Sequence, residues 1–148
     1  MTESLSQRLV GSWELLSRID RSQSGEPREE PSLGSDPIAF LVFDRTGHFA
    51  VQFMKRNRTG VEDGARGAQV VNNSRAQGGY DAYFGTFIVD EEKGTVATKL
   101  TAALARESVG QIFTRAMSVD GDFLTIRLDT TTPTGEAVTR TLRWRRVA

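Results

Sequence analysis

Apolar and polar residues alternate at every second position over most of this 148-residue chain, in short runs that turn-forming residues separate. This period of two predicts β-strands, because successive side chains of a strand point to opposite faces of its sheet. The clearest runs are 13–19, 38–43, 48–54, 82–90, 95–102, 111–119, 123–130 and 137–147. We therefore predict eight short strands in a single domain that covers residues 1–148.

The beginning of the chain predicts a short helix instead of a strand. Ser4 and Gln7 have the spacing of a capping box, and Leu5 and Leu9 supply one apolar side. Gly11 then ends the helix, and the strand pattern starts directly after it.

Two longer segments interrupt the alternation. Residues 20–37 are polar and hold three of the four prolines, which predicts a long exposed loop. Residues 55–79 are rich in glycine and carry scattered charge. A short helix over 65–76 is compatible with this segment, but Gly67 and the pair Asn72–Asn73 weaken it.

The number and length of the strands predict an all-β fold. Eight short strands with no long helix between them favour an antiparallel up-and-down barrel, since closing the sheet removes its exposed edges. We expect an eight-stranded barrel with a short N-terminal helix. A sandwich of two sheets is the alternative.

Composition removes several classes of function. There is no cysteine and a single histidine, His48, so we expect no disulfide, no thiolate nucleophile, no metal site and no cofactor. Nineteen basic residues balance nineteen acidic residues, which predicts no nucleic-acid partner. No run approaches the roughly 20 apolar residues of a membrane span, and the N-terminus lacks the apolar core of a signal peptide. A cytoplasmic location is therefore expected.

A resemblance to a known family starts at residues 11–13, the sequence GSW, which follow the predicted helix and open the first strand. They resemble the G-x-W signature of lipocalins, in which the helix closes one end of the barrel and the tryptophan plugs that end. The resemblance implies a barrel floor that contains Gly11, Trp13 and Trp144. It also implies a basic residue of the last strand across the tryptophan ring, for which Arg143 and Arg145 are the candidates.

Longer segments extend the resemblance. Residues 35–58, 82–90, 119–128 and 142–147 are similar, in the same order, to the bacterial and fungal lipocalin-like domain family. The YFGT sequence within 82–90 is among its more specific features. The chain departs from the family in the glycine-rich stretch 59–80 and at Thr98 and Lys99, where relatives often have histidines.

An eight-stranded barrel is either filled by its side chains or holds one small ligand, so the inward-facing residues decide its function. On the first strand the alternation places Trp13, Leu15, Ser17 and Ile19 on one face and Arg18 on the other. For residues 38–54 both faces are apolar, and the pattern predicts no direction. The candidate cavity residues of the other strands are Tyr83, Phe87, Thr98, Phe113, Arg115, Met117 and Arg140.

Two of these inward residues, Arg115 and Arg140, are arginines, which keep their charge. Burying such a charge costs several kcal/mol, as an order of magnitude, unless the charge is paired, and the predicted inward face holds no acid. Water, an outer carboxylate that folds inward or a ligand oxygen is the expected partner. The alternative is that these arginines serve packing, with Arg140 stacked on Trp13 or Trp144.

Other polar residues have a structural alternative beside the functional one. Tyr83 is a candidate hydrogen-bond donor in the cavity, but its hydroxyl could instead reach solvent. His48 follows a predicted hairpin turn, where it is more typical of an exposed residue than of a general base. Lys99 and the basic run 55–58 are expected to face water.

The sequence therefore predicts the binding of a small, largely apolar molecule with a carboxylate or an enol or carbonyl oxygen, with residues 55–80 as a portal. The resemblance also allows a metal-free cyclase or isomerase, in which Arg115 or Tyr83 polarises a carbonyl group of a hydrophobic precursor. A third alternative is a filled barrel that serves as an interaction module. The chain is compatible with a homodimer.

Overall fold

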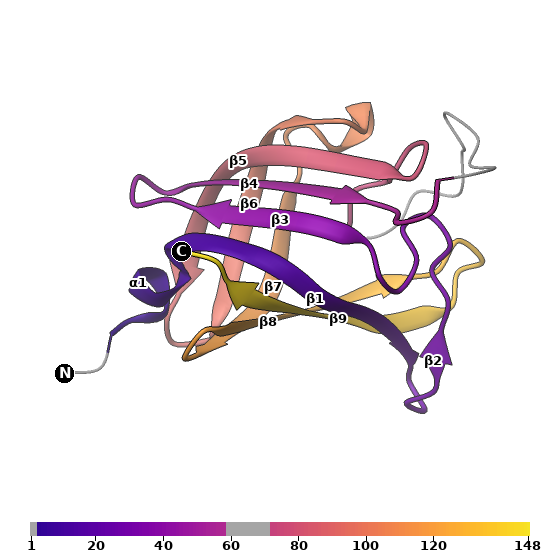
Figure 1. Ribbon diagram of the computed structural model, residues 1–148, viewed down its shortest axis with the longest axis horizontal. Coiled ribbons are helices and arrows are strands. Elements are labelled where there is room, and N and C mark those ends of the chain that lie inside the picture. The colour runs from indigo at the N-terminus through magenta and orange to yellow at the C-terminus, as the bar shows by residue number, and fades with distance from the viewer. Residues whose placement is uncertain (1–2, 59–71) are drawn as a thin grey trace.

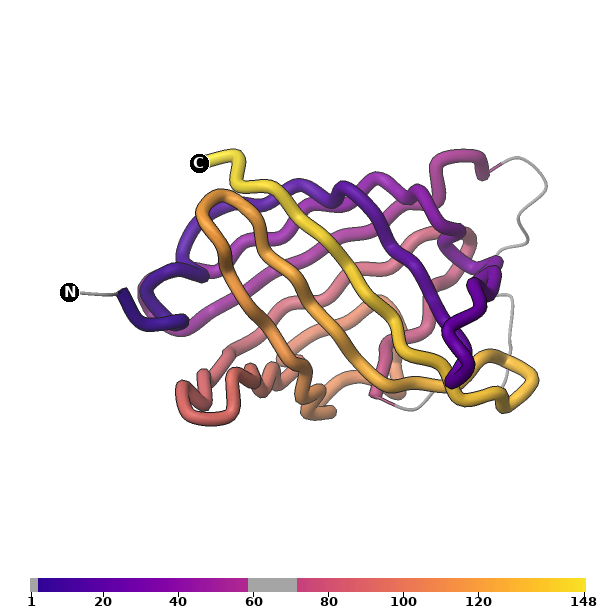
Figure 2. Tube along the Cα trace, turned by 90° about the horizontal axis from the view of Figure 1, so that it is seen from below, coloured from indigo at the N-terminus to yellow at the C-terminus, as the bar shows by residue number. Residues whose placement is uncertain are grey.

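The computed structural model describes residues 3–58 and 72–148, which form one antiparallel sheet that closes into a barrel (Figures 1 and 2). The sheet order is β2-β1-β3-β4-β5-β6-β7-β8-β9, and β1 also pairs with β9. The elements are α1 (Leu5–Leu9), β1 (Gly11–Ser22), β2 (Pro27–Arg28), β3 (Ile38–Phe43), β4 (His48–Met54), β5 (Tyr80–Asp90), β6 (Thr95–Ala103), η1 (Arg106–Ser108), β7 (Ile112–Asp120), β8 (Phe123–Thr131) and β9 (Ala137–Arg146). The predicted barrel is confirmed. Strand β2 pairs only with β1, outside the eight strands that close it.

Helix α1 lies at one end of the barrel (Figure 1). Its predicted capping box is present, with Ser4 as the N-cap and Gln7 as its partner. Glu91, in the turn between β5 and β6, accepts hydrogen bonds from the backbone N–H groups of Leu5 at 2.8 Å and Ser6 at 3.1 Å. A carboxylate at a helix N-terminus satisfies free N–H groups there, so it holds the helix against this end of the barrel.

Gly11 and Trp13 join the helix to the barrel. Gly11 has a φ of +142°, and a Cβ atom there would lie 2.7 Å from the carbonyl oxygen of Ala148, so a larger residue does not fit. Trp13 is completely buried, and its Nε1 donates to the carbonyl oxygen of Leu9 at 3.0 Å.

The basic residue across this tryptophan is Arg146, and the prediction of Arg143 or Arg145 is wrong. The guanidinium of Arg146 lies 4.3 Å from the centre of the Trp13 ring and also donates to two carbonyl oxygens of the helix region. Trp144 and Arg146 share the inward face of β9, whereas the two predicted arginines alternate with them and point outward. Arg145 pairs there with Glu14.

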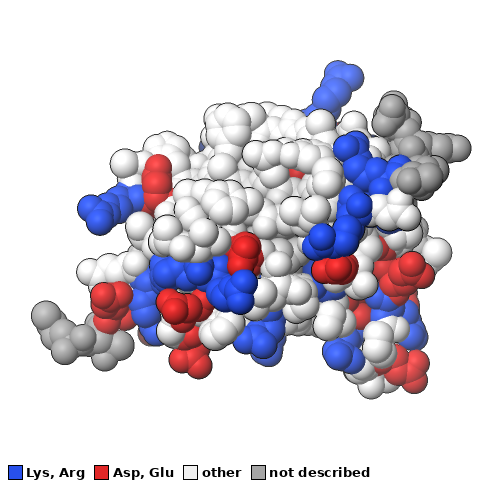
Figure 3. All heavy atoms as spheres, viewed as in Figure 1, with Lys and Arg blue, Asp and Glu red and all other residues white. Residues whose placement is uncertain are grey.

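The predicted inward faces of β5 and of β7 to β9 are confirmed by the burial of alternate residues. On β6 the prediction holds as far as Leu100, but a register shift places Ala103 and not Ala102 opposite the inward Tyr83. The structure also decides the direction of β3 and β4, which the sequence left open: Leu41, Phe43, Phe49, Val51 and Phe53 point inward. The outer face of β3 carries the exposed apolar residues Ile38 and Phe40, and the outer face of β5 carries Phe84 and Ile88. Figure 3 shows a broad uncharged surface over β3, β4 and β5. A homodimer remains a prediction.

Strand β1 departs from the predicted alternation. Its pairing with β9 shifts register between Leu15 and Ser17, which indicates a β-bulge. An extra residue in one strand reverses the facing of every residue that follows. Arg18 and Asp20 are therefore buried inside the barrel, while Ile19 lies outside, opposite to the prediction.

The segment 20–37 is exposed over much of its length, as its composition predicts, but it is not a loop throughout and part of it is buried. Strand β1 continues to Ser22, and the segment then folds back at the end of the barrel opposite α1 (Figure 1). Leu33 is buried there, and the side chain of Glu30 is only 9% exposed. This part of the segment is buried in spite of its polar composition, because Arg18 of β1 pairs with Glu30. We call the end of the barrel opposite α1, which the segment covers, the mouth of the barrel.

The structure tests only part of the short helix that the sequence allows over residues 65–76. Residues 65–71 lie outside the described residues, and 72–76 are not helical. Among the described residues, no helix has the length and hydrophobicity that would be needed to cross a membrane.

Candidate functional site

Within the residues that the structure describes, the walls of the barrel interior enclose two small cavities. The inner cavity, about 30 Å³, has mainly apolar walls that include Phe49, Val51 and Trp144. The mouth cavity, about 20 Å³, has mainly polar walls. Either volume accommodates one or two water molecules. Tyr83 and Arg115 line both cavities and therefore stand at the boundary between the apolar and the polar compartment.

Arg115 is half-buried, and the groups that hold it in the described part of the chain are neutral. Its Nη1 donates to the hydroxyl of Tyr83 at 3.3 Å, and its Nη2 donates to the carbonyl oxygen of Asn72 at 3.2 Å and to Oδ1 of Asn73 at 3.3 Å. The guanidinium lies 5.1 Å from the centre of the Phe113 ring. Within the described residues, its Nε is buried without a hydrogen-bond partner and no carboxylate lies within ion-pair distance.

Tyr83 is oriented by the groups around it. Its ring meets Phe49 and Phe113 edge-on, with centroids 6.0 and 6.2 Å away. The residue is 6% exposed, so the alternative in which its hydroxyl reaches solvent does not apply. Since the hydroxyl oxygen accepts a hydrogen bond from Arg115, its own hydrogen remains available for another acceptor.

Arg140, the second predicted arginine, has a partner in the protein. Its Nε and Nη2 donate to the two carboxylate oxygens of Asp20 at 2.7 and 2.9 Å. The alternative of stacking on Trp13 or Trp144 is wrong, whereas the expected partner in the form of an outer carboxylate that folds inward is present as Asp20. The bulge in β1 is the reason, because it turns Asp20 toward Arg140.

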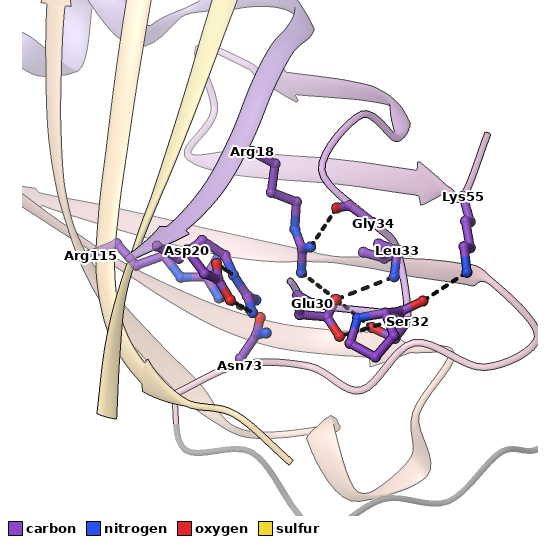
Figure 4. A network of polar contacts seen from close by, with 11 residues as sticks. Arg18, Asp20, Glu30, Ser32, Leu33, Gly34, Lys55, Asn73 and Arg115 are labelled. Carbon is purple, nitrogen blue, oxygen red and sulfur yellow. Dashed lines mark hydrogen bonds and ion pairs between the residues drawn. The ribbon is translucent and has the colours of Figure 1, made fainter. Parts of the chain in front are cut away.

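A second buried ion pair joins strand β1 to the part of segment 20–37 that covers the mouth of the barrel (Figure 4). Nη2 of Arg18 lies 3.0 Å from Oε1 of Glu30, and Nη1 donates to the carbonyl oxygen of Gly34 at 3.0 Å. Burial by itself would raise the pKa of Glu30. The charge of Arg18 and the hydrogen bond from the hydroxyl of Ser32 lower this pKa by more than burial raises it, so it lies below its usual range. Glu30 therefore remains a carboxylate and keeps the loop attached.

Asp81 is a functional candidate that the sequence interpretation missed. It points inward from β5, lines the mouth cavity and is 3% exposed. Burial raises the pKa of its carboxyl group from 3.8 to about 6, although a hydrogen bond from Ser74 at 3.1 Å opposes the rise. Extending the alternation two residues back from Tyr83 would have found this residue.

The remaining predicted residues fall into three groups. Thr98 and Met117 line the inner cavity, and the hydroxyl of Thr98 donates to the carbonyl oxygen of Phe113 at 3.2 Å. Phe113 lines neither cavity but supports Arg115. Phe87 also lines neither and packs against Phe43, with ring centroids 4.9 Å apart.

The residues outside the barrel lie where they were expected. His48 and Lys99 are exposed. Within the described residues, no three His, Cys, Asp or Glu side chains lie close enough together to hold a metal ion.

A closed barrel of eight antiparallel strands, with a short helix at one end and a mainly apolar interior, defines a lipocalin-like protein. The family model described as a lipocalin-like domain matches residues 10–147. The chain belongs to this lipocalin-like family, as its sequence resemblance predicted. A comparison with curated proteins finds no match.

Proposed function

We propose that the barrel binds a small, largely apolar molecule whose carboxylate, enol or carbonyl oxygen meets Arg115. The arginines that line the mouth cavity are Arg18, Arg115 and Arg140, as far as the described residues extend. Arg18 and Arg140 each pair with a buried carboxylate, whereas the partners of Arg115 among the described residues are neutral. This difference carries the proposal, because an inward-facing guanidinium that forms no ion pair within the described residues is suited to recognising a ligand oxygen.

The two cavities are too small for such a ligand unless side chains move. Tyr83 and Arg115 separate the cavities, so a shift of Arg115 joins the apolar and polar compartments. In the bound state the ligand oxygen replaces Asn72 and Asn73 as the partner of Arg115. The apolar part of the ligand then lies among Phe49, Val51 and Met117.

The small cavities also fit the alternative of a filled barrel that binds no ligand. Trp144 provides a direct test, because it lines the inner cavity and its fluorescence should respond to an occupant. We would titrate the protein with decanoate and with decan-1-ol, which has the same chain but no charge. A Trp144→Phe variant identifies the part of the signal that comes from this tryptophan.

Arg115→Met should weaken decanoate binding by about 10-fold or more, the value of a charge-assisted hydrogen bond, and should leave decan-1-ol unaffected. Arg127→Met is the matched control, because Arg127 is exposed on β8. If neither compound changes the Trp144 signal at millimolar concentration, the filled barrel is the better description. Mass spectrometry of molecules that co-purify with the protein would identify the natural ligand class.

A further inference from the structure

We propose that Asp81, Tyr83 and Arg115 form a proton-transfer site in the mouth cavity, at which Asp81 removes a proton from the carbon next to a ligand carbonyl group. The inference rests on the proposed function, because the carbonyl oxygen is the ligand oxygen that Arg115 meets. It extends that function from binding to the enolisation or isomerisation of an apolar ketone.

The three side chains line one cavity from two strands. Asp81 and Tyr83 are neighbours on the inward face of β5, about 7 Å apart along the strand. Arg115 reaches Tyr83 from β7 with a hydrogen bond of 3.3 Å. A base and two hydrogen-bond donors therefore border the same small volume, as a substrate with adjacent C–H and C=O groups requires.

Asp81 has the environment of a base that works near neutral pH. In the part of the chain that the structure describes, it makes no ion pair, and its side chain accepts hydrogen bonds from neutral donors, the hydroxyl of Ser74 and the backbone N–H of Ala82. Burial raises its pKa to about 6. A carboxylate with this pKa accepts a proton more readily than an exposed one and is still largely ionised at pH 7.

Tyr83 and Arg115 are placed to stabilise the charge that proton removal creates. The C–H electron pair forms the C=C bond of an enolate, the π electrons of the carbonyl group move to its oxygen, and the proton goes to Asp81. The Tyr83 hydroxyl, which already accepts a hydrogen bond from Arg115, donates to the enolate oxygen together with this guanidinium. Return of the proton from Asp81 to the same carbon, or to a conjugated one, completes an exchange or an isomerisation without any net oxidation.

Decan-2-one is the test substrate, since it has the chain length of the binding probes and a carbonyl group with acidic neighbouring C–H bonds. Its binding is followed by Trp144 fluorescence, and its proton exchange in D2O by the loss of its α-proton NMR signals. The variants are Asp81→Asn and Tyr83→Phe. Asp120→Asn is the control, because Asp120 is exposed on β7.

We expect the wild-type protein and the control to accelerate exchange above the buffer rate. Asp81→Asn should lose about 100-fold or more of this acceleration while binding decan-2-one as before, and Tyr83→Phe should reduce it. The rate should rise with pH around a midpoint near 6, because the carboxylate form is the base. The charged groups that act on Asp81 are Arg115 on β7 and Arg18 on β1, and both keep their charge over this range.

Two results would overturn the proposal. If decan-2-one binds but the wild-type protein does not exceed Asp81→Asn in exchange, the barrel is a binding protein only. If neither decanoate nor decan-2-one changes the Trp144 signal, the proposed function fails together with this inference. Asp81→Asn replaces a buried charge by a neutral group of similar shape, so it should fold, and Tyr83→Phe gives an independent second readout.

Discussion

Arg140 and Asp20 face each other across strands β9 and β1 and form a bidentate ion pair inside the barrel, with N–O distances of 2.7 and 2.9 Å. Asp20 is 3% exposed and Arg140 is 4% exposed. The pair joins the two strands that close the sheet, so it connects the packing of the interior with barrel closure.

Asp20→Asn should destabilise the protein by about 3–5 kcal/mol, because it leaves Arg140 buried without its anion. The free energy of unfolding in urea measures this cost, with Asp129→Asn on the exposed face of β8 as the control. Asp20→Leu combined with Arg140→Met should recover most of the loss, since the double variant removes both charges of the pair and leaves neither buried without its partner. A cost below about 1 kcal/mol for Asp20→Asn would show that water reaches the pair.

Arg146→Lys should lower the free energy of unfolding by about 1–3 kcal/mol, because a lysine cannot cover Trp13 and reach two helix carbonyl groups at once. Arg145→Lys on the outward face of β9 should change it by less than about 1 kcal/mol. Near-ultraviolet circular dichroism reports the packing of Trp13 in both variants. Equal effects of the two substitutions would argue against a special role for Arg146.

Gly11→Ala should destabilise the barrel clearly more than Gly135→Ala. Both glycines have a positive φ, +142° and +93°, so alanine is strained at either position, at a cost of about 1–2 kcal/mol. Only at Gly11 would the new Cβ atom also lie 2.7 Å from a backbone oxygen, that of Ala148, whereas the space at Gly135 is open. Thermal unfolding compares the two variants, and equal losses would mean that the C-terminus moves aside freely.

Asp81→Asn should stabilise the protein above pH 7, by up to about 3 kcal/mol. The pKa of Asp81 is raised in the folded state, so the folded protein binds this proton more tightly than the unfolded chain does. Stability of the wild-type protein is therefore lost as the pH rises from 3.8 to about 6, and the variant avoids this loss. Unfolding free energies between pH 4 and pH 8 should diverge across that range, while Asp120→Asn should follow the wild type.

Met117→Trp distinguishes an expandable cavity from a solid core. Met117 lines the inner cavity, and an indole ring occupies the space that the proposed ligand would use. We expect the variant to fold with a loss below about 1.5 kcal/mol and to lose decanoate binding. A loss of about 3 kcal/mol, typical of overpacking, would support the filled barrel.

The sequence predicted residues of the candidate site only on strands where apolar and polar positions alternate regularly. The period of two identified Tyr83 on β5, and Arg115 and Met117 on β7, as inward residues, although β5 also carries apolar residues, Phe84 and Ile88, on its outer face. Asp81 was missed because the predicted strand began at residue 82, two residues after β5 begins. On β3 and β4 both faces are apolar, and only burial in the closed barrel distinguishes them.

The sequence by itself determined the strands, the barrel and most of its inward residues, because these follow from patterns that repeat over a few neighbouring positions. The tertiary structure decided which charged side chains form ion pairs inside the barrel. The bulge in β1 arises where this strand pairs with β9, more than one hundred residues away, and it turns Arg18 and Asp20 inward. Arg146, and not Arg145, covers Trp13 because the register of the same two strands places it there. Such long-range pairing leaves no local pattern, so only the folded barrel shows that Arg18 and Arg140 have carboxylate partners while Arg115 has neutral ones.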